Sequence, residues 1–224
     1  RAARAGFRSD TVDAPGPVDY RPKVKGAVMY PILRFIHEIR SARRATPLGP
    51  LDAHVSTHRI SPLDIDPWRE LNNGRTLTLY DLGRIPMAIR LGITDTLRAR
   101  GWGFTVAGNS VRYRRRIRVF QRITQVSRVL GWDSRFVYME QSMWSRGDCA
   151  NHMLLRVAIV GGAARKGMIP PEVFMEALGH HGPSPELPAW VAAWIEADAL
   201  RPWPPELPGG IAGQSPDLPA TQPG

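Results

Sequence analysis

Cysteine and lysine are almost absent from this 224-residue chain. The single cysteine, Cys149, excludes a disulfide framework within the chain and a zinc site built from several cysteines, and it fits a reducing compartment such as the cytoplasm. Lysine occurs only at positions 23, 25 and 166, so arginine supplies nearly all of the formal net charge of +10. Because such an arginine bias can reflect codon usage, we predict no nucleic-acid partner, whereas an acidic or phosphorylated small molecule is a suitable one.

Long apolar runs are missing where they would matter most: residues 1–25 contain none that resembles a signal peptide, and residues 27–45 are too short and too charged to cross a bilayer. The hydrophobic fraction of 43% is nevertheless ordinary for a globular protein. We expect a flexible arm and a basic amphipathic helix over residues 1–50, a folded domain over 51–162 and a helical extension over 163–201. The proline- and glycine-rich residues 202–224 are expected to be disordered.

Residues 27–45 have the pattern of a basic amphipathic helix. Apolar residues recur there at helical spacing, and another face carries Arg34, Arg40, Arg43 and Arg44. Such a helix packs more often on its own domain or on a sister subunit than on an anionic membrane. Peripheral contact with the inner face of the membrane through residues 27–45 is the alternative.

The pattern of residues 51–162 predicts one helix enclosed by strands. A first strand is expected within 51–61, and the window of about 72–91 is apolar over most of a helical circumference, although Pro86 can kink or split that helix. Strand-like segments follow at 104–116, 117–130, 135–144 and 150–160, and the last is apolar enough to be central. This order suits a helix wrapped by a single curved antiparallel sheet.

Chemistry-bearing residues concentrate in the stretch 64–84, DIDPWRELNNGRTLTLYDLGR. Two carboxylates, Asp64 and Asp66, lie ahead of the predicted helix. The free N–H groups and the positive dipole of a first helical turn can polarise a carbonyl oxygen, while a nearby acid serves as base or nucleophile. An aspartate in this place also commonly caps the helix or shapes a turn without any catalytic role.

This stretch, the strands beyond it and the basic helix ahead of it resemble the hotdog-fold acyl-CoA thioesterases, and most of all the branch related to 4-hydroxybenzoyl-CoA thioesterase. The resemblance covers about residues 51–162, and its most specific part is Asp-x-Asp followed by paired asparagines. It implies an α+β hotdog fold, in which a curved antiparallel sheet wraps a long central helix. It also implies a homodimer or homotetramer that hydrolyses an acyl-CoA thioester to free acid and CoA without a dissociable cofactor.

In that family the second acid of Asp-x-Asp is catalytic, which implies that Asp66 attacks the thioester carbonyl or activates a water. Backbone N–H groups around Asn72, Asn73 and Gly74 would hold the oxyanion. The two asparagines either orient the lytic water or hold the loop through hydrogen bonds to its backbone. For Asp64 we expect a supporting role in the turn.

Glu70 is a departure from the family pattern, because many relatives carry a histidine two residues before the paired asparagines. Glu70 either serves as a second general base or holds the loop through an ion pair with Arg69 or Arg75; a third alternative is that the protein has lost efficient hydrolysis. Within the predicted helix, Asp81 is a reserve candidate that we expect to pair with Arg84, three residues on.

A row of arginines alternates with apolar residues beyond position 110: Arg112, Arg114, Arg116, Arg118 and Arg122. In a strand, or across two neighbouring strands, this spacing places them on one face. That face is either solvated or meets the phosphates of a coenzyme A arm, with Arg112, Arg114 and Arg116 as the binding candidates. Asn109 and Ser110 are candidates for contact with the thioester or its acyl chain.

Neither His58 nor the His180–His181 pair has acidic or cysteine neighbours at metal-ligand spacing, so we predict no metal. Two other functions compete with hydrolysis. A non-catalytic acyl-thioester or lipid-binding module at the membrane surface would not need Asp66. A polyanion-binding protein would show a steep salt dependence spread over several arginines.

Overall fold

The computed structural model describes residues 30–161 and 167–207, which fall into two compact units divided between Glu186 and Leu187. The flexible arm and most of the disordered tail expected from the sequence lie outside the described residues. In the second unit, the described residues form helix α5 (Ala189–Ala199).

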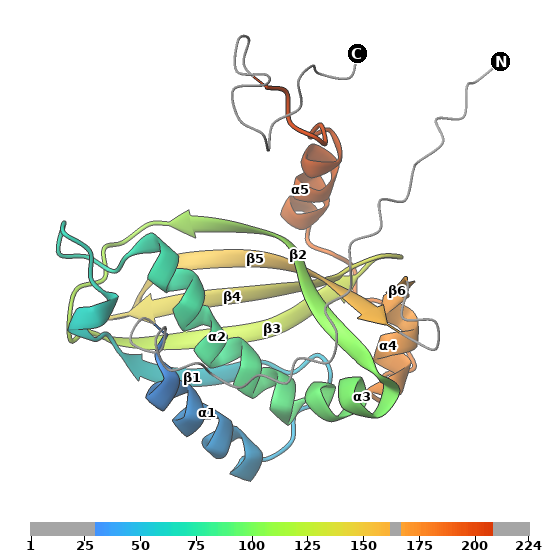
Figure 1. The fold of residues 1–224 in the computed structure, drawn as a ribbon, viewed down its shortest axis with the longest axis horizontal. Coiled ribbons are helices and arrows are strands. Elements are labelled where there is room, and N and C mark those ends of the chain that lie inside the picture. Colours follow the sequence, from blue (N-terminus) through green and yellow to red (C-terminus); the bar gives the residue numbers. More distant parts are fainter. Residues whose placement is uncertain (1–29, 162–166, 208–224) are drawn as a thin grey trace, which may run out of the picture. The chain divides into compact units, whose positions relative to one another are not determined.

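Within its described residues, the first unit consists of one antiparallel sheet and the helices on it (Figure 1). The strands are β1 (His54–Arg59), β2 (Trp102–Tyr113), β3 (Arg122–Trp132), β4 (Val137–Ser145), β5 (Asp148–Gly161) and β6 (Met168–Ile169). The helices are α1 (Ile32–Arg44), the short 3-10 helix η2 (Pro62–Asp64), α2 (Asn73–Arg90), α3 (Ile93–Arg100) and α4 (Pro171–Ala177).

The strands follow the order β1-β3-β4-β5-β2, and β6 pairs with β5. The expectation that the apolar run in β5 is an inner strand is confirmed, since β5 lies between β4 and β2. The arginine prediction is wrong in two respects. First, β2 ends at Tyr113, so the arginines from Arg114 to Arg118 lie in a connection. Second, β2 and β3 are not neighbours, because β5 and β4 separate them.

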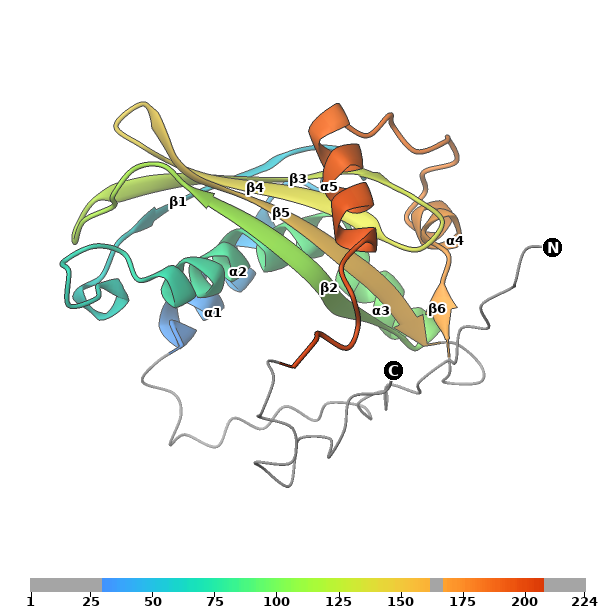
Figure 2. The same cartoon turned by 90° about the horizontal axis from the view of Figure 1, so that it is seen from above.

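The central helix α2 lies across one face of the sheet, with α1 beside it (Figure 2). Its apolar side chains Leu79, Tyr80, Leu82 and Met87 are fully buried, and the helix continues through Pro86. Sheet residues such as Met139, Met153 and Leu155 complete the core. Together these elements confirm the predicted hotdog fold, a long helix wrapped by a curved antiparallel sheet.

Gly83 allows α2 to lie close to the sheet. A Cβ atom there would stand 2.5 Å from Gln125 Oε1 and 2.9 Å from Ser127 Oγ. The buried side chains of Gln125 and Gln141 donate hydrogen bonds to two carbonyl oxygens of α2, those of Leu79 at 2.7 Å and Tyr80 at 2.9 Å. Polar sheet residues therefore hold the middle of the helix where glycine leaves room for them.

The amphipathic helix begins at Ile32 and packs on its own domain, as expected, through Ala42 and Phe35. Its Leu33 remains 84% exposed and Ile36 39% exposed. None of the helices within 30–161 and 167–207 combines the length and the apolar character that crossing a bilayer requires.

Two local features differ from the sequence-based expectations. Helix α3 was not predicted; it begins after Gly92, whose positive φ of 72° provides a sharp break from α2. The strand expected over 117–130 begins five residues late, at Arg122. The reason is that Ile117 is buried in the preceding connection, where its carbonyl accepts a 2.8 Å hydrogen bond from Leu71 N–H.

Candidate functional site

Asp64 is fully buried and bonded on both carboxylate oxygens. Its Oδ1 accepts hydrogen bonds from Arg34 at 2.8 Å and from Arg75 at 3.1 and 3.3 Å, and its Oδ2 accepts one from Ser61 N–H at 2.9 Å. Burial by itself raises the pKa of Asp64, but the hydrogen bond from Arg34, the backbone bond and the two arginine charges together lower it. Asp64 thus joins α1, η2 and α2, which fits the expected supporting role.

Asp66 shapes a tight turn in the loop between η2 and α2. Its Oδ1 accepts hydrogen bonds from Trp68 N–H at 3.0 Å and Glu70 N–H at 3.3 Å, while its own N–H donates to Glu70 O at 2.9 Å. Its Oδ2 accepts no hydrogen bond from the described part of the chain. The carboxylate is half-buried, so one oxygen is fixed and the other is available for chemistry.

Glu70 forms an ion pair with Arg116, with 3.0 Å between Oε2 and Nε. Pairing with Arg69 or Arg75 is therefore a wrong prediction, because Arg75 is already bound to Asp64. The pair joins the 65–71 loop to the connection between β2 and β3.

The start of α2 leaves backbone donors free. Asn72 caps the helix: its Oδ1 accepts a hydrogen bond from Arg75 N–H at 3.1 Å, and its own N–H donates to Asp64 O at 2.9 Å. Of the two roles predicted for this asparagine, the structure shows the loop-holding bond. The exposed Asn73 and Gly74 follow, and their N–H groups donate to no acceptor within the described ranges. These two groups lie at the positive end of an 18-residue helix.

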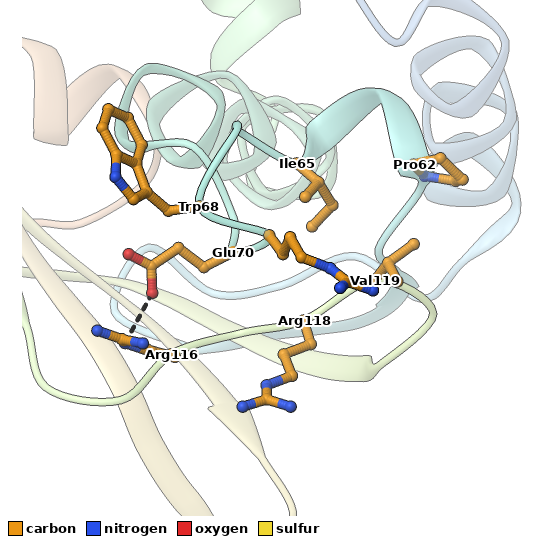
Figure 3. A pocket seen from close by; sticks show the side chains of 8 residues that line it. Pro62, Ile65, Trp68, Glu70, Arg116, Arg118 and Val119 are labelled. Carbon is orange, nitrogen blue, oxygen red and sulfur yellow. Dashed lines mark ion pairs between the residues drawn. The ribbon is translucent and has the colours of Figure 1, made fainter.

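A cavity of about 530 Å³ lies beside this loop (Figure 3). Its lining residues come from η2, the loop and the β2–β3 connection: Pro62, Ile65, Trp68, Arg69, Glu70, Arg116, Arg118 and Val119. Three arginines and one glutamate line it, together with Trp68, which is 77% exposed. The combination of excess positive charge and aromatic surface suits a phosphorylated ligand.

A second cavity, of about 250 Å³, adjoins the first through Glu70 and Arg116, which line both. It extends from the start of α2 to the ends of β2 and β5, and its other lining residues are Leu71, Asn73, Thr76, Tyr113, Arg114, Arg115, Ile117 and Asn151. Thr76, Tyr113 and Asn151 could not be predicted as site residues, because strand register or helix packing brings each of them to the cavity.

The structure brings together only part of the predicted site. Glu70, Asn73, Arg114 and Arg116 line the cavities. Asp66 lies in the same loop as Glu70, and Asn72 and Gly74 follow that loop, but these three line neither cavity. The strand residues Asn109, Ser110 and Arg112 are exposed on β2 and line neither cavity, so their role stays a prediction.

Asp81 pairs with Arg84 in the same helix, as predicted, and also accepts a hydrogen bond from Tyr30. Across residues 30–161 and 167–207, no three histidine, cysteine or acidic side chains gather as a metal site would need.

The thioesterase-like superfamily model matches residues 60–195, and the chain belongs to this superfamily. Among similar proteins, protein THEM6 of Xenopus laevis is 28% identical over 148 residues, covering 65% of this chain and 69% of the frog protein. Protein THEM6 of Drosophila melanogaster is 31% identical over 86 residues, covering 38% of this chain and 45% of the fly protein. The match thus spans less than half of the fly relative.

A solved structure supports the fold. The structure of a Lactobacillus plantarum protein, provisionally described as an oleoyl thioesterase, has a TM-score of 0.53 and 17% sequence identity to this chain, covering 71% of this chain and 58% of that protein. At this identity the likeness shows the fold alone.

Proposed function

We propose that this protein hydrolyses acyl-CoA thioesters to a free acid and CoA at the start of α2. The observation that carries the proposal is the arrangement around Asp66. Within residues 30–161 and 167–207, this carboxylate has one oxygen without a hydrogen bond, and it precedes a helix whose first N–H groups, at Asn73 and Gly74, have no acceptor. Membership of the thioesterase-like superfamily supports the reaction class.

Two routes are consistent with this arrangement. In the first, Asp66 Oδ2 attacks the thioester carbonyl, the CoA thiolate leaves, and water then hydrolyses the mixed anhydride. In the second, Asp66 takes a proton from a water that attacks the same carbon, and the proton passes to the leaving thiolate. Both routes place negative charge on the carbonyl oxygen, where the N–H groups of Asn73 and Gly74 would stabilise it.

The larger cavity would receive the phosphates of the coenzyme. Arg69, Arg116 and Arg118 can form charge-assisted hydrogen bonds to phosphate oxygens, and Trp68 offers a stacking surface for the adenine ring. Glu70, which is neutralised by Arg116, would then help to hold Arg116 in place.

A second copy of the chain would complete the site. The edge strand β2 has twelve residues, with Phe104, Val106 and Tyr113 exposed, and it could pair with the same strand of another subunit to form a homodimer or a homotetramer. We place the protein in the cytoplasm on the basis of its single cysteine, with peripheral membrane contact through residues 27–45 supported by the exposed Leu33 and Ile36.

A non-catalytic acyl-binding module is the second candidate. It is favoured by one observation: Asp66 lines neither cavity, and the acid that does, Glu70, is paired with an arginine. In such a module the same cavities would hold the ligand without hydrolysis.

A panel of acyl-CoA substrates, followed by release of free thiol, distinguishes the two functions. We expect turnover by the wild-type protein and a loss of about 100-fold or more in kcat for Asp66→Asn. Asp52→Asn is the matched control, because Asp52 also accepts a backbone hydrogen bond in a turn, from Gly49 N–H at 2.7 Å, but lies outside both cavities. Binding of acyl-CoA without thiol release on any chain length would instead favour the binding module.

A further inference from the structure

Asn151 is a nearly inaccessible polar residue in the wall of the smaller cavity. It lies on β5, opposite Tyr113 of β2 and Met143 of β4, and only 2% of its surface is exposed. Apolar residues such as Leu71 and Ile117 line the same cavity. A polar side chain in this position needs hydrogen-bond partners.

Among the described residues, only one end of the Asn151 amide has such a partner. The hydroxyl of Tyr80, on α2, donates a hydrogen bond to Asn151 Oδ1. Burial raises the pKa of Tyr80 well above its usual range, so this hydroxyl keeps its proton and acts as a donor. The Asn151 amide nitrogen donates to no group in the described part of the chain.

An amide held in this way presents N–H groups to the cavity and so selects an acceptor. Asn73, whose backbone N–H is also unused, lines the same cavity at the start of α2. Donors from a helix start and from a strand therefore converge on one space, as required to bind an oxygen that gains negative charge during a reaction.

We propose that the Nδ2 group of Asn151 binds the carbonyl oxygen of the thioester substrate, and that Tyr80 positions this amide. The proposal rests on the proposed function and extends it by naming a substrate-binding residue on the sheet. Asn151 contacts the substrate in this account, whereas Tyr80 acts only through Asn151.

Two inert substrate analogues test the contact without any turnover. In the ketone analogue, a methylene group replaces the thioester sulfur and the carbonyl remains; in the reduced analogue the carbonyl is absent as well. We expect the wild-type protein to bind the ketone analogue about tenfold more tightly in titration calorimetry, consistent with one well-made hydrogen bond.

Asn151→Asp removes the N–H donors while it keeps the size of the side chain and an acceptor for Tyr80. We expect the preference for the ketone analogue to disappear in this variant, while the affinity for the reduced analogue changes by less than about threefold. Tyr80→Phe should reduce the preference by a smaller factor, because the amide is then free to rotate. The control is Gln121→Glu, which also changes an amide to a carboxylate but lies outside both cavities.

The outcomes separate this inference from the proposed function. A preference that persists in both Asn151→Asp and Tyr80→Phe would overturn the inference, while thiol release by the wild-type protein would still support hydrolysis. Equal loss of affinity for both analogues in Asn151→Asp would show a merely structural role and would also overturn it. If neither analogue binds to the wild-type protein, the inference and the proposed function fail together.

Discussion

Asp64 and Asp66 are two residues apart, yet their surroundings differ in every respect that matters for chemistry. Asp64 is fully buried, and its carboxylate is bonded to two arginines and a backbone N–H. Asp66 is half-buried, and in the part of the chain that the structure describes only one of its oxygens accepts hydrogen bonds, from two backbone N–H groups. The first acid connects three elements of the fold, and the second shapes a turn and keeps a free oxygen.

The difference shows that an Asp-x-Asp pair can divide structural and chemical work between its members. A carboxylate that already accepts hydrogen bonds from two guanidinium groups is a poor base, because proton transfer to it would break those bonds. A carboxylate fixed through one oxygen is oriented without being neutralised. Substitution of Asp64 should therefore lower stability more than activity, and substitution of Asp66 should lower activity more than stability.

Asp64→Asn should have the largest effect on stability. The change leaves Arg34 and Arg75 without their carboxylate, and removal of one partner from a buried ion pair typically costs about 3–5 kcal/mol. We expect a loss of about 3 kcal/mol in the free energy of unfolding, measured by urea denaturation. Asp52→Asn, at an exposed turn, should change it by less than about 1 kcal/mol; equal losses in both variants would contradict the structural role.

The pH dependence of stability should separate the contribution of Asp64 from that of two buried histidines. Burial and then the nearby Arg90 lower the pKa of His54 to about 4; burial, followed by Arg34 and the neighbouring histidines, lowers that of His58 to about 4 as well. The unfolded chain therefore binds more protons between pH 6.5 and 4, so stability falls as the pH falls through this window. From pH 7 to 5 we expect a loss of about 2 kcal/mol per histidine.

The pKa of Asp64 is lower in the folded protein than in the unfolded chain. Its ionised carboxylate therefore contributes to stability above the pKa of the unfolded chain, and this contribution is lost only as the pH falls through the pKa of the folded protein, below 3.8. Denaturation curves of wild type and Asp64→Asn should accordingly show parallel losses between pH 7 and 5. His58→Gln should show a smaller loss than wild type over the same range. An unchanged pH dependence in His58→Gln would exclude this histidine as a source of the effect.

A smaller effect on stability is expected from substitutions at two glycines of α2. Gly83→Ala forces a Cβ atom against Gln125 and Ser127, and overpacking of this kind costs about 1–3 kcal/mol. Gly74→Ala meets only Asn72 Oδ1, at 3.2 Å, at the exposed start of the helix. We expect thermal unfolding to show a lower Tm for Gly83→Ala and little change for Gly74→Ala. Equal Tm values would mean that Gln125 and Ser127 move aside and that close packing at Gly83 does not stabilise the fold.

Much of the fold follows from periodicity alone. The window of 72–91 became α2, with bounds at Asn73 and Arg90, because a helix that is apolar on most sides must be enclosed. Strand order did not follow, since antiparallel strands of similar pattern fit several sheet topologies. The strand predicted from the alternating arginines ends at Tyr113. The pattern misled because Ile117 is buried in a connection, and in the sequence such a residue cannot be told from a buried strand residue.

The candidate site was predictable only where its residues are adjacent in the chain. The stretch from Asp64 to Gly74 could be found from its motif, although nothing in it indicated that Arg34 would bind Asp64 or that Arg116 would bind Glu70. Asn151 and Tyr80 could not be found, because they are 71 residues apart and meet through the folding of α2 against the sheet.

Turnover per folded molecule, compared between Asp64→Asn and Asp66→Asn on one acyl-CoA substrate, tests the division of roles most directly. The fraction of folded protein is fixed first from the denaturation curves, so that a loss of stability is not mistaken for a loss of chemistry. We predict that Asp64→Asn keeps kcat within about tenfold of wild type, whereas Asp66→Asn loses about 100-fold or more. Equal kcat values in Asp66→Asn and wild type would contradict the account.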